Sequence, residues 1–451
     1  MDAILARLAA RTLTAGEKLP SIRRFAAVMQ VSPATVVEAY DRLAAQGVIA
    51  SRPGSGFYVA GSAPPLSLAE VEPKRERAMD PLWVSRQTLD PHPDLARPGC
   101  GWLPPEWMPN LAIRRAIRSV ARAPDAILAD YGGTRGSLGL RRLLARVAAQ
   151  DGLDLPVDQI LLTSSGTQAI DLICRFLLHP GDTVLVDDPC YFNFQALLKA
   201  HRARIVTVPY TQTGPDPDAF NQVLAAHRPR LYLTNSALHN PTGATMTPQT
   251  AHRILTAAAA HDLTIVEDEI FAEFEPEPSV RLAALDGLAR VVRIGSFSKT
   301  LSASVRCGYI AARADWIEGL IDLQVATQFG GASPVATEIV LKTLEDGGYR
   351  KHVAALREKL ARRRKAVTAR LAELAITPWV QPRGGFYLWC RLPDAMDGAQ
   401  LARLALAENM VLAPGNVFSA SQTAPDLMRF NVAQMEPASF DVLDRAMKAA
   451  K

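Results

Sequence analysis

The sequence predicts a two-part α/β protein, in which a small module of helices and a hairpin precedes a large domain with a mostly parallel sheet. The chain has 451 residues, which is more than one hydrophobic core usually serves. Residues 1–60 have the pattern of short helices followed by two strands. Residues 81–451 alternate helical segments with short β-rich runs, which is typical of a parallel sheet.

The composition is that of an ordinary globular protein, with 48% apolar and 21% charged residues. No apolar run approaches the roughly 20 residues of a bilayer-spanning helix, and the first residues carry charges where a signal peptide is apolar. We therefore expect a cytoplasmic protein. The five cysteines are scattered without a C-x-x-C pair, and no H-E-x-x-H occurs, so neither a disulfide framework nor a metal site is indicated.

The N-terminal module has the pattern of a winged helix-turn-helix. A first helix is expected over residues 4–13, a second runs from Ser21 to residue 29, and a third runs from Ser32 to about residue 45, with each serine as an N-cap. The stretch GVIASRPGSGFYVAG (47–61) predicts two strands around a Pro-Gly-Ser-Gly turn. Residues 61–80 lose periodicity and gain proline, serine and charge, which predicts a linker.

A winged helix-turn-helix binds DNA by setting its second helix in the major groove, with basic side chains on the phosphates. The first 60 residues hold seven Lys/Arg and four Asp/Glu, which permits nucleic acid without demonstrating it. The alternative is that the module serves only oligomerisation. A basic stretch at 350–370 could add DNA contacts or be the solvated face of a long helix. The expected DNA contacts are Arg23, Arg24, Ser32, Thr35, Arg52 and Ser55.

Polar clusters follow several of the expected strands in the large domain. Four of the runs end in SSGTQ, DPCY, ED and SFSK. Because ligands in open α/β sheets lie beyond the carboxyl ends of the strands, these clusters should converge on one site. The expected strands are 159–164, 183–188, 204–209, 230–235, 263–268 and 291–296.

Together the clusters supply the groups that a pyridoxal 5'-phosphate (PLP) site needs. Lys299 in SFSK can form the Schiff base, and Asp268 at the end of LTIVED can keep the pyridine nitrogen protonated. Asn240 in HNPTG can donate to the phenolic oxygen, and Tyr191 in DPCYF can stack on the ring. Each fragment alone is also explained by a turn, a cap or a solvated lysine, but the set at strand ends favours PLP.

The phosphate of PLP is expected at the SSGTQ turn. A glycine and hydroxyls stand there between a strand and a helix, where free N–H groups and the helix dipole favour an anion. Two serines and one guanidinium near Lys299 can complete the cradle. The expected phosphate ligands are Ser165, Gly166, Thr167, Gln168, Ser296, Ser298 and Arg306.

From about residue 80 onwards the sequence resembles the aspartate-aminotransferase-like, fold type I PLP enzymes, through SSGTQ, P-x-Y, NPTG, ED, SFSK and RFNVA. Residues 1–60 resemble GntR-type winged helices, through GEKLPSIRRFA, VSPATVVEAYDRLAAQGVI and SRPGSGF. The fusion in this order resembles the MocR-type transcriptional regulators. The resemblance implies a large domain with a mostly parallel sheet and a smaller α+β subdomain over about 331–451.

The resemblance also implies roles for two further residues. Arg429 in LMRFNVAQ takes the place of the arginine that binds the substrate α-carboxylate. Tyr131 in YGGTRG takes the place of the tyrosine that reaches the partner subunit's phosphate, which implies a homodimer with shared sites. Many relatives carry a tyrosine two residues after the aspartate, where this chain has Ile270, with Phe271 next, so the PLP ring is expected to lose one hydrogen bond.

Three functions remain open at this point. The first is a dimeric regulator that binds double-stranded operator DNA and uses a PLP-loaded domain to sense an amino acid or amine. The second is a working PLP-dependent aminotransferase with an accessory DNA-binding domain. The third is a sensor of PLP itself, in which Arg429 is dispensable.

Overall fold

The computed structural model describes residues 1, 4–5, 13, 16–60, 81–89 and 95–450. The chain divides into two compact units, Met1–Arg77 and Ala78–Lys451, and each is described by itself. The linker expected over 61–80 and most of the helix expected over 4–13 lie outside the described residues.

The N-terminal unit has the winged helix-turn-helix arrangement that the sequence predicts. Helices α2 (Ile22–Met29) and α3 (Pro33–Ala45) precede an antiparallel hairpin of β1 (Ile49–Arg52) and β2 (Gly56–Val59). Ser21 and Ser32 accept hydrogen bonds from backbone N–H groups in the first turns of α2 and α3, so both N-cap predictions are confirmed.

A small apolar core holds α3 against the hairpin. Tyr40 and Leu43 of α3 are fully buried. The Tyr40 ring packs edge-on against Phe57, with 5.0 Å between ring centroids, and its hydroxyl donates to the carbonyl of Pro20 at 2.9 Å. These contacts fix the exposed face of α3 relative to the wing.

The second unit is built around an eight-stranded sheet in the order β3-β10-β9-β8-β7-β4-β5-β6. The run β9-β8-β7-β4-β5 is parallel, as predicted, and six strands fall on the expected runs. Strand β10 is antiparallel to both β3 and β9 and was not predicted. The strands are β3 (Ile160–Thr163), β4 (Thr183–Asp188), β5 (Arg204–Thr211), β6 (Gly214–Pro215), β7 (Leu231–Thr234), β8 (Thr264–Asp268), β9 (Val291–Ser296) and β10 (Gly308–Ala311).

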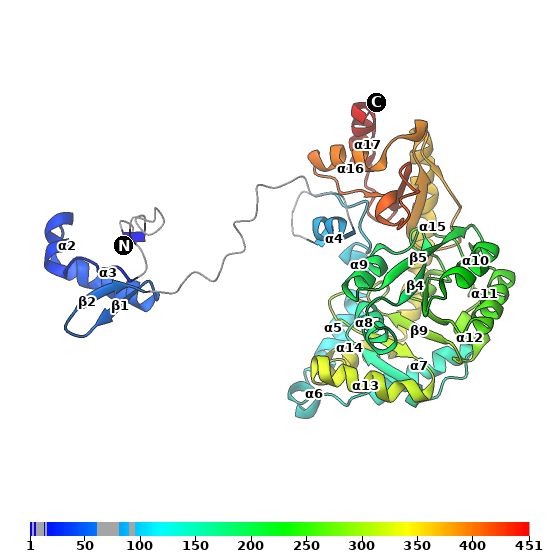
Figure 1. Cartoon of the computed structure of the whole chain (residues 1–451), viewed down its shortest axis with the longest axis horizontal. Coiled ribbons are helices and arrows are strands. Elements are labelled where there is room, and N and C mark those ends of the chain that lie inside the picture. The colour runs from blue at the N-terminus through cyan, green and yellow to red at the C-terminus, as the bar shows by residue number, and fades with distance from the viewer. Residues whose placement is uncertain (2–3, 6–12, 14–15, 61–80, 90–94, 451) are drawn as a thin grey trace. The chain divides into compact units, whose positions relative to one another are not determined.

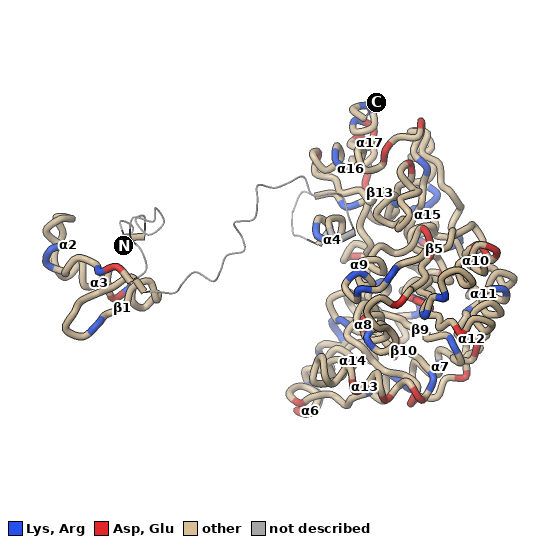
Figure 2. The backbone as a smooth tube through the Cα atoms, viewed as in Figure 1, with Lys and Arg blue, Asp and Glu red and all other residues tan. Residues whose placement is uncertain are grey.

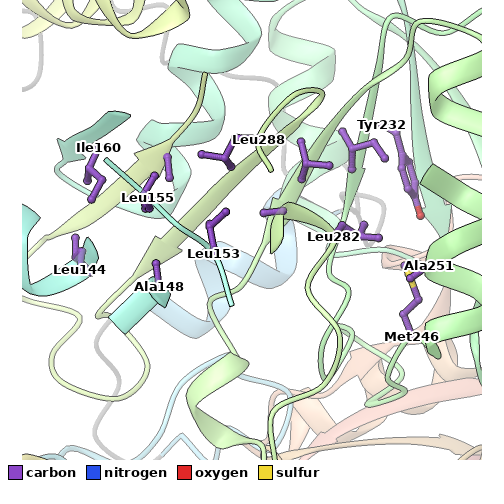
Figure 3. Close-up of a cluster of buried hydrophobic side chains, with 14 of the residues drawn as sticks. Leu144, Ala148, Leu153, Leu155, Ile160, Tyr232, Met246, Ala251, Leu282 and Leu288 are labelled. Carbon is purple, nitrogen blue, oxygen red and sulfur yellow. The ribbon is translucent and has the colours of Figure 1, made fainter. Parts of the chain in front are cut away.

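Helices pack on both faces of this sheet (Figure 1). Successive strand residues point to opposite faces, so Leu185 of β4 joins one core while Val184 and Val186 join the other. Figure 3 shows part of the first core, where Leu144 and Ala148 lie near the start of β3. The helices are α4 (Pro81–Leu89), α5 (Asn110–Val120), α6 (Asp125–Ala129), α7 (Leu138–Gln150), α8 (Gly166–Leu177), α9 (Phe192–Ala200), α10 (Pro217–His227), α11 (Pro248–Ala260), α12 (Leu282–Asp286), α13 (Ala314–Gln328) and α14 (Pro334–Glu345), with 3-10 turns η1 (Pro105–Trp107), η2 (Val157–Gln159) and η3 (Ala272–Phe274).

The C-terminal part of the second unit forms a smaller antiparallel sheet in the order β11-β12-β14-β13. Its helices bury their apolar faces in a separate core with β12 and β14. Its elements are α15 (Gly348–Glu373), β11 (Thr377–Pro378), β12 (Tyr387–Arg391), η4 (Pro393–Ala395), α16 (Gly398–Ala407), β13 (Ala413–Pro414), η5 (Gly415–Val417), β14 (Leu427–Asn431) and α17 (Pro437–Ala450).

The basic stretch at 350–370 lies within the long helix α15. Arg357 donates to the carbonyl of Glu273 at 2.7 Å, and Arg364 donates to the carbonyl of Gly385 at 2.7 Å. Part of this stretch therefore serves packing within the unit. In the described part of the chain, no helix is both long enough and apolar enough to cross a membrane.

Candidate functional site

Lys299 lies in the turn that follows β9, at the carboxyl end of the large sheet. Its ammonium group donates to the carbonyl oxygen of Gly101 at 2.7 Å. Desolvation in this half-buried position lowers the pKa of Lys299 to about 8, and the nearby Arg429 acts in the same direction. A lysine with this pKa is about one-tenth neutral at pH 7, far more than an ordinary lysine, and the neutral amine is the form that attacks an aldehyde.

Asp268 is the last residue of β8 and is buried beside the Lys299 turn, because β8 and β9 are parallel neighbours. Its carboxylate accepts a hydrogen bond from the backbone N–H of Ile270 at 3.0 Å, and its carbonyl accepts one from Asn235 at 3.0 Å. Burial raises the pKa of Asp268 to about 6, while the hydrogen bonds and Lys299 oppose the rise. The group is still mostly ionised at neutral pH.

Arg429 comes from β14 of the smaller sheet and is fully buried. It donates to the side-chain oxygen of Asn240 at 2.8 Å and to the carbonyl of Gly99 at 2.7 Å. Its guanidinium lies 4.2 Å from the ring centroid of Tyr387. Within the described residues no carboxylate pairs with Arg429, so the buried charge meets only neutral oxygens, and a ligand carboxylate would complete it.

Asn240 and Tyr191 also belong to this cluster. Asn240 is 2% exposed, and since Arg429 uses its oxygen, its NH₂ group is left to donate. Tyr191 precedes α9 and packs against Phe192 and Phe194. Burial raises the pKa of Tyr191 to about 12, with Arg429 and Asp268 close enough to influence it. The two residues therefore lie with Arg429 and Asp268, as the sequence predicts for one site.

The two turns expected to hold a phosphate lie against each other. Ser165 caps α8 by accepting a hydrogen bond from the N–H of Gln168 at 3.0 Å. A side chain built on Gly166 would meet the Cβ of Ser296 at 3.5 Å, and the hydroxyls of Ser296 and Ser298 are 2.9 Å apart. The N-terminus of α8 thus opens onto hydroxyls from the Lys299 turn, which is a donor set that suits a phosphate.

Gly308 of β10 makes this approach possible. A Cβ at Gly308 would lie 2.7 Å from the backbone carbon of Ser165 and 2.9 Å from the nitrogen of Gly166. Any larger residue would push the N-terminus of α8 away from the Ser296 turn. The sequence offered no signal for this glycine, because β10 itself was not predicted.

The remaining phosphate candidates differ in their burial and in their hydrogen-bond partners. Gln168 accepts from Ser164, while its NH₂ group is buried and has no partner among the described residues. Thr167 is exposed in the first turn of α8. Arg306 is exposed, has a left-handed φ of 56°, and lies near enough to Lys299 to help lower the pKa of that lysine. An unpaired buried donor and a nearby guanidinium both fit a bound phosphate.

Tyr131 is not brought to the site within this chain. It is 74% exposed and packs edge-on against Phe329, which is 70% exposed, with 5.2 Å between the ring centroids. The residue that was expected to reach a partner's phosphate is therefore on the surface.

Sequence reasoning missed the groups that hold the key side chains. The carbonyls of Gly99 and Gly101 anchor Arg429 and Lys299, and main-chain oxygens have no signature in a sequence. Asn235 and Tyr387 were also missed. For Tyr387 the sequence did hold a signal, which is the aromatic pair beside two glycines in GGFYLW. The five cysteines are free and buried, and the described residues contain no group of three or more His, Cys, Asp or Glu that could hold a metal ion.

The expected DNA contacts lie on one small unit, and Figure 2 shows basic positions on α2 and on the hairpin. Arg23, Arg24 and Thr35 are exposed. Ser32 is exposed too, but its hydroxyl is engaged as the cap of α3 through the N–H and hydroxyl of Thr35.

The wing presents a cluster around Tyr58. The Arg52 guanidinium lies 4.5 Å from the Tyr58 ring centroid, and the Ser55 hydroxyl is 2.5 Å from the Tyr58 hydroxyl. Lys18, which was not among the candidates, lies 5.8 Å from the same ring. The hydrogen bond with Ser55 lowers the pKa of Tyr58, and the two cations act in the same direction. Two cations and a second hydroxyl therefore lie around Tyr58 of the wing.

Comparison with known proteins agrees with both parts. Residues 108–446 match the family "Aminotransferase class I and II", and residues 1–59 match "Bacterial regulatory proteins, gntR family". The uncharacterized HTH-type transcriptional regulator YdcR of Escherichia coli is 29% identical over 433 residues, covering 93% of this chain and 91% of that protein.

Two aminotransferases are also similar to this chain, over a smaller share of it. Aromatic-amino-acid aminotransferase 1 of Thermococcus litoralis is 30% identical, over 73% of this chain and 82% of its own. The structure of LysN, an alpha-aminoadipate aminotransferase of Thermus thermophilus complexed with N-(5'-phosphopyridoxyl)-L-leucine, has a TM-score of 0.73 at 25% identity, over 81% of this chain and 95% of that chain. The chain therefore belongs to the class I and II aminotransferase family, whose fold is PLP-dependent, and joins it to a GntR-type domain as MocR-type transcriptional regulators do.

Proposed function

We propose that this regulator uses PLP to sense an amino acid or amine, and that sensing alters how a homodimer binds operator DNA. One observation carries the proposal: a lysine of lowered pKa, a buried aspartate and a buried arginine without a carboxylate partner among the described residues converge in a chain that also bears a winged helix-turn-helix. The proposed limits are 1–60 for DNA binding, 61–80 for the linker and 81–451 for PLP binding.

In this proposal the residues of the large unit share the work of holding PLP. Lys299 would be the covalent anchor, and the ionised carboxylate of Asp268 would hold the proton on the ring nitrogen. Asn240 donates to the phenolic oxygen, Tyr191 covers the ring, and the turns at Ser165 and Ser296 hold the phosphate. When bound, PLP supplies an aldehyde that condenses with amines and a ring that withdraws electrons.

Arg429 is proposed to select the ligand. Its buried guanidinium already has two neutral oxygens as partners, so a carboxylate would gain a charge-assisted hydrogen bond in a site shielded from water. The arginine connects the smaller sheet to Asn240, which follows β7 of the large sheet. Binding of a carboxylate would therefore change contacts between the two sheets, which is the kind of differential interaction that coupling requires.

We propose a homodimer because an interface would bury the exposed aromatic pair of Tyr131 and Phe329. Two large aromatic side chains in contact, both more than two-thirds exposed, are typical of an interface. Tyr131 of one subunit would then reach the partner's phosphate turn. Two winged helices in one dimer would address paired half-sites.

A working aminotransferase is the second candidate, favoured by the similarity to the Thermococcus litoralis enzyme. Against full activity stands Ile270, which replaces the expected tyrosine and cannot donate a hydrogen bond. The next residue, Phe271, is buried among Phe274, Phe386 and Tyr387 and cannot donate one either. Spectroscopy with a panel of L-amino acids and 2-oxo acids separates the two: steady turnover favours the enzyme, and a stable ligand complex favours the sensor.

The proposal is tested by measuring binding to DNA from upstream of the protein's own gene, with and without PLP. Lys299→Ala should abolish the effect of PLP, whereas the exposed control Lys365→Ala should keep it. Loss of the amino-acid response in Arg429→Ala would separate ligand sensing from sensing of PLP itself. If the protein binds no upstream DNA under any of these conditions, the proposal is wrong.

A further inference from the structure

A cavity of about 420 Å³ lies in the large unit beside the turn that carries Lys299 and apart from the cluster assigned to PLP. Its volume falls within the roughly 300–1,000 Å³ of small-molecule sites. Its walls come from α7, the segment after β8, β9 and the turn that follows it, the start of β10, the end of α14 and the first turns of α15. Of the residues assigned above to PLP or its ligand, only Ser296 lines it.

The deep wall holds a buried carboxyl group with one free oxygen. The side chain of Glu269 is 1% exposed, and its Oε2 lies 2.7 Å from Arg293 and 3.5 Å from Arg281. Its Oε1 has no hydrogen-bonding partner among the described residues. A buried polar atom without a partner is costly, so this oxygen suits a donor from a ligand.

Tyr309 places a hydroxyl near this carboxyl group. Its ring lies close against Gly295, where an added Cβ would be 2.5 Å from the ring. Burial raises the pKa of Tyr309, and the neighbouring charges that act on it are Arg293, Glu269, Glu273 and Asp151. Within the described part of the chain its hydroxyl forms no hydrogen bond, so it is available to a ligand.

The outer wall carries two guanidinium groups without carboxylate partners. Arg350 is exposed at the start of α15, and Arg357 lies two helical turns further on, with one nitrogen on the carbonyl of Glu273. Neither pairs with a carboxylate of the described residues, whereas the deeper Arg293 pairs with Asp151 and Glu269. Glu273 also lines the cavity, and its carboxylate accepts hydrogen bonds from the hydroxyls of Thr300 and Tyr349. Four arginines and three carboxylates line the cavity, so its formal charge is +1, and Arg350 and Arg357 are the two arginines without an ion pair among the described residues.

Apolar side chains line the space between these two ends. Leu144 and Val147 of α7, Leu344 of α14 and Val353 of α15 contribute to the wall. Such a surface suits a hydrocarbon body rather than a second charged group.

We propose that this cavity binds a small organic acid whose carboxylate pairs with Arg350 and Arg357, whose apolar body lies along α7, and whose hydrogen-bond donor meets Glu269. The ligand needs no amine and no chemistry at Lys299, so the inference goes beyond the proposed function. The cavity also touches the PLP site: Ile270 lines it and donates to Asp268, and Ser296 lines it and contacts Ser298.

The test is calorimetric titration of the PLP-loaded full chain with 4-hydroxyphenylacetate. This acid has a carboxylate, an apolar ring and a phenol donor, but no amine that could react with PLP. Saturable binding of one molecule per chain is expected, and equally in Lys299→Ala. Phenylacetate, without the phenol, and 4-hydroxybenzyl alcohol, without the carboxylate, should both bind more weakly.

Substitutions of residues that line the cavity test whether the acid binds there. Arg350→Gln and Arg357→Gln should each weaken binding roughly tenfold, because each removes a charge-assisted hydrogen bond. Arg362→Gln, an exposed position on the same helix outside the cavity, should leave binding unchanged. Val147→Phe, at a wall position that is 40% exposed, should fill the cavity and abolish binding without unfolding the protein.

Three results would overturn the inference. The first is absence of binding at millimolar acid. The second is loss of binding in Arg429→Gln together with full binding in Arg350→Gln, which would put the acid at the PLP site. The third is equal affinity for phenylacetate and 4-hydroxyphenylacetate, which would remove the role of Glu269. None of these depends on DNA or on Lys299, so they leave the proposed function untouched.

Discussion

Replacing Lys299 by methionine is expected to stabilise the PLP-free protein at neutral pH. Methionine keeps the length and apolar stem of the side chain and removes the ammonium group that burial disfavours. A lysine whose main role is structural would give the opposite result, because its loss would only remove a hydrogen bond.

The magnitude follows from the pKa. A pKa lowered from 10.5 to about 8 corresponds to a cost of roughly 3 kcal/mol for keeping Lys299 protonated in the folded state. The variant also loses the hydrogen bond to the Gly101 carbonyl, worth about 1 kcal/mol. The net gain in the free energy of unfolding is then about 2 kcal/mol.

The difference in the free energy of unfolding between wild type and Lys299→Met should depend on pH. Below about pH 8 the lysine is protonated in both the folded and the unfolded state, so the full cost applies. Between about 8 and 10.5 the folded protein binds fewer protons than the unfolded chain, so wild-type stability rises with pH relative to the variant. The advantage of Lys299→Met should therefore shrink over this range.

Urea unfolding followed by tryptophan fluorescence measures this difference. All six tryptophans lie between residues 83 and 389, so the signal reports only the second unit. Lys365→Met, at an exposed position, is the matched control and should show no such pH dependence. A variant that is less stable than wild type at pH 7, or a difference that stays constant from pH 7 to 10, would refute the reasoning about Lys299.

Three further outcomes are expected. Asp268→Asn should weaken PLP binding by at least roughly tenfold, since it removes the only assigned charge facing the ring nitrogen; equilibrium dialysis against PLP measures this, and unchanged affinity would contradict the assignment. Phe329→Glu should convert a dimer to monomers in sedimentation velocity, whereas Leu285→Glu, on the exposed side of α12, should not. Arg52→Ala should lower the slope of log affinity for DNA against log salt by roughly one, while Arg445→Ala, which pairs with Glu408, should leave it unchanged.

Much of the fold was predictable because local patterns determine it. The expected runs at 183–188 and 291–296 coincide with β4 and β9, since each is a short apolar segment bounded by turns. Strand β10 was missed because four residues, two of them Gly and Ala, give no pattern by themselves. Its strand character comes from pairing with β3 and β9 on either side, which is a tertiary effect.

The sequence predicted the side chains of the site, but not the backbone carbonyls that hold two of them in place. Lys299 and Asp268 come together as their positions at strand ends suggested, and Asn240 and Arg429, the latter expected from the family resemblance, join them. The carbonyls that hold two of them come from the segment around Gly101, nearly 200 residues before Lys299 in the chain. Only long-range folding brings such groups together, so no local motif could identify them.

The cavity lined by Glu269 is another feature that the sequence alone could not predict. Asp268 and Glu269 are consecutive at the end of a strand, where neighbouring side chains point to opposite sides. Asp268 lies beside Lys299, and Glu269 lies in the wall of the 420 Å³ cavity. In the sequence the pair appears as a simple acidic cluster, and only the structure separates the two roles.

The central claim is that ligand binding at Lys299 and DNA binding are coupled. Coupling is reciprocal, so an amino acid that changes operator affinity must have its own affinity changed by the same factor when operator is present. The direct measurement is titration of the PLP-loaded full chain with each common L-amino acid, followed by absorbance, with and without its upstream DNA. At least one amino acid is expected to bind with an affinity that shifts with DNA in wild type and not in Arg429→Ala; identical affinities with and without bound DNA for every amino acid would contradict the coupling.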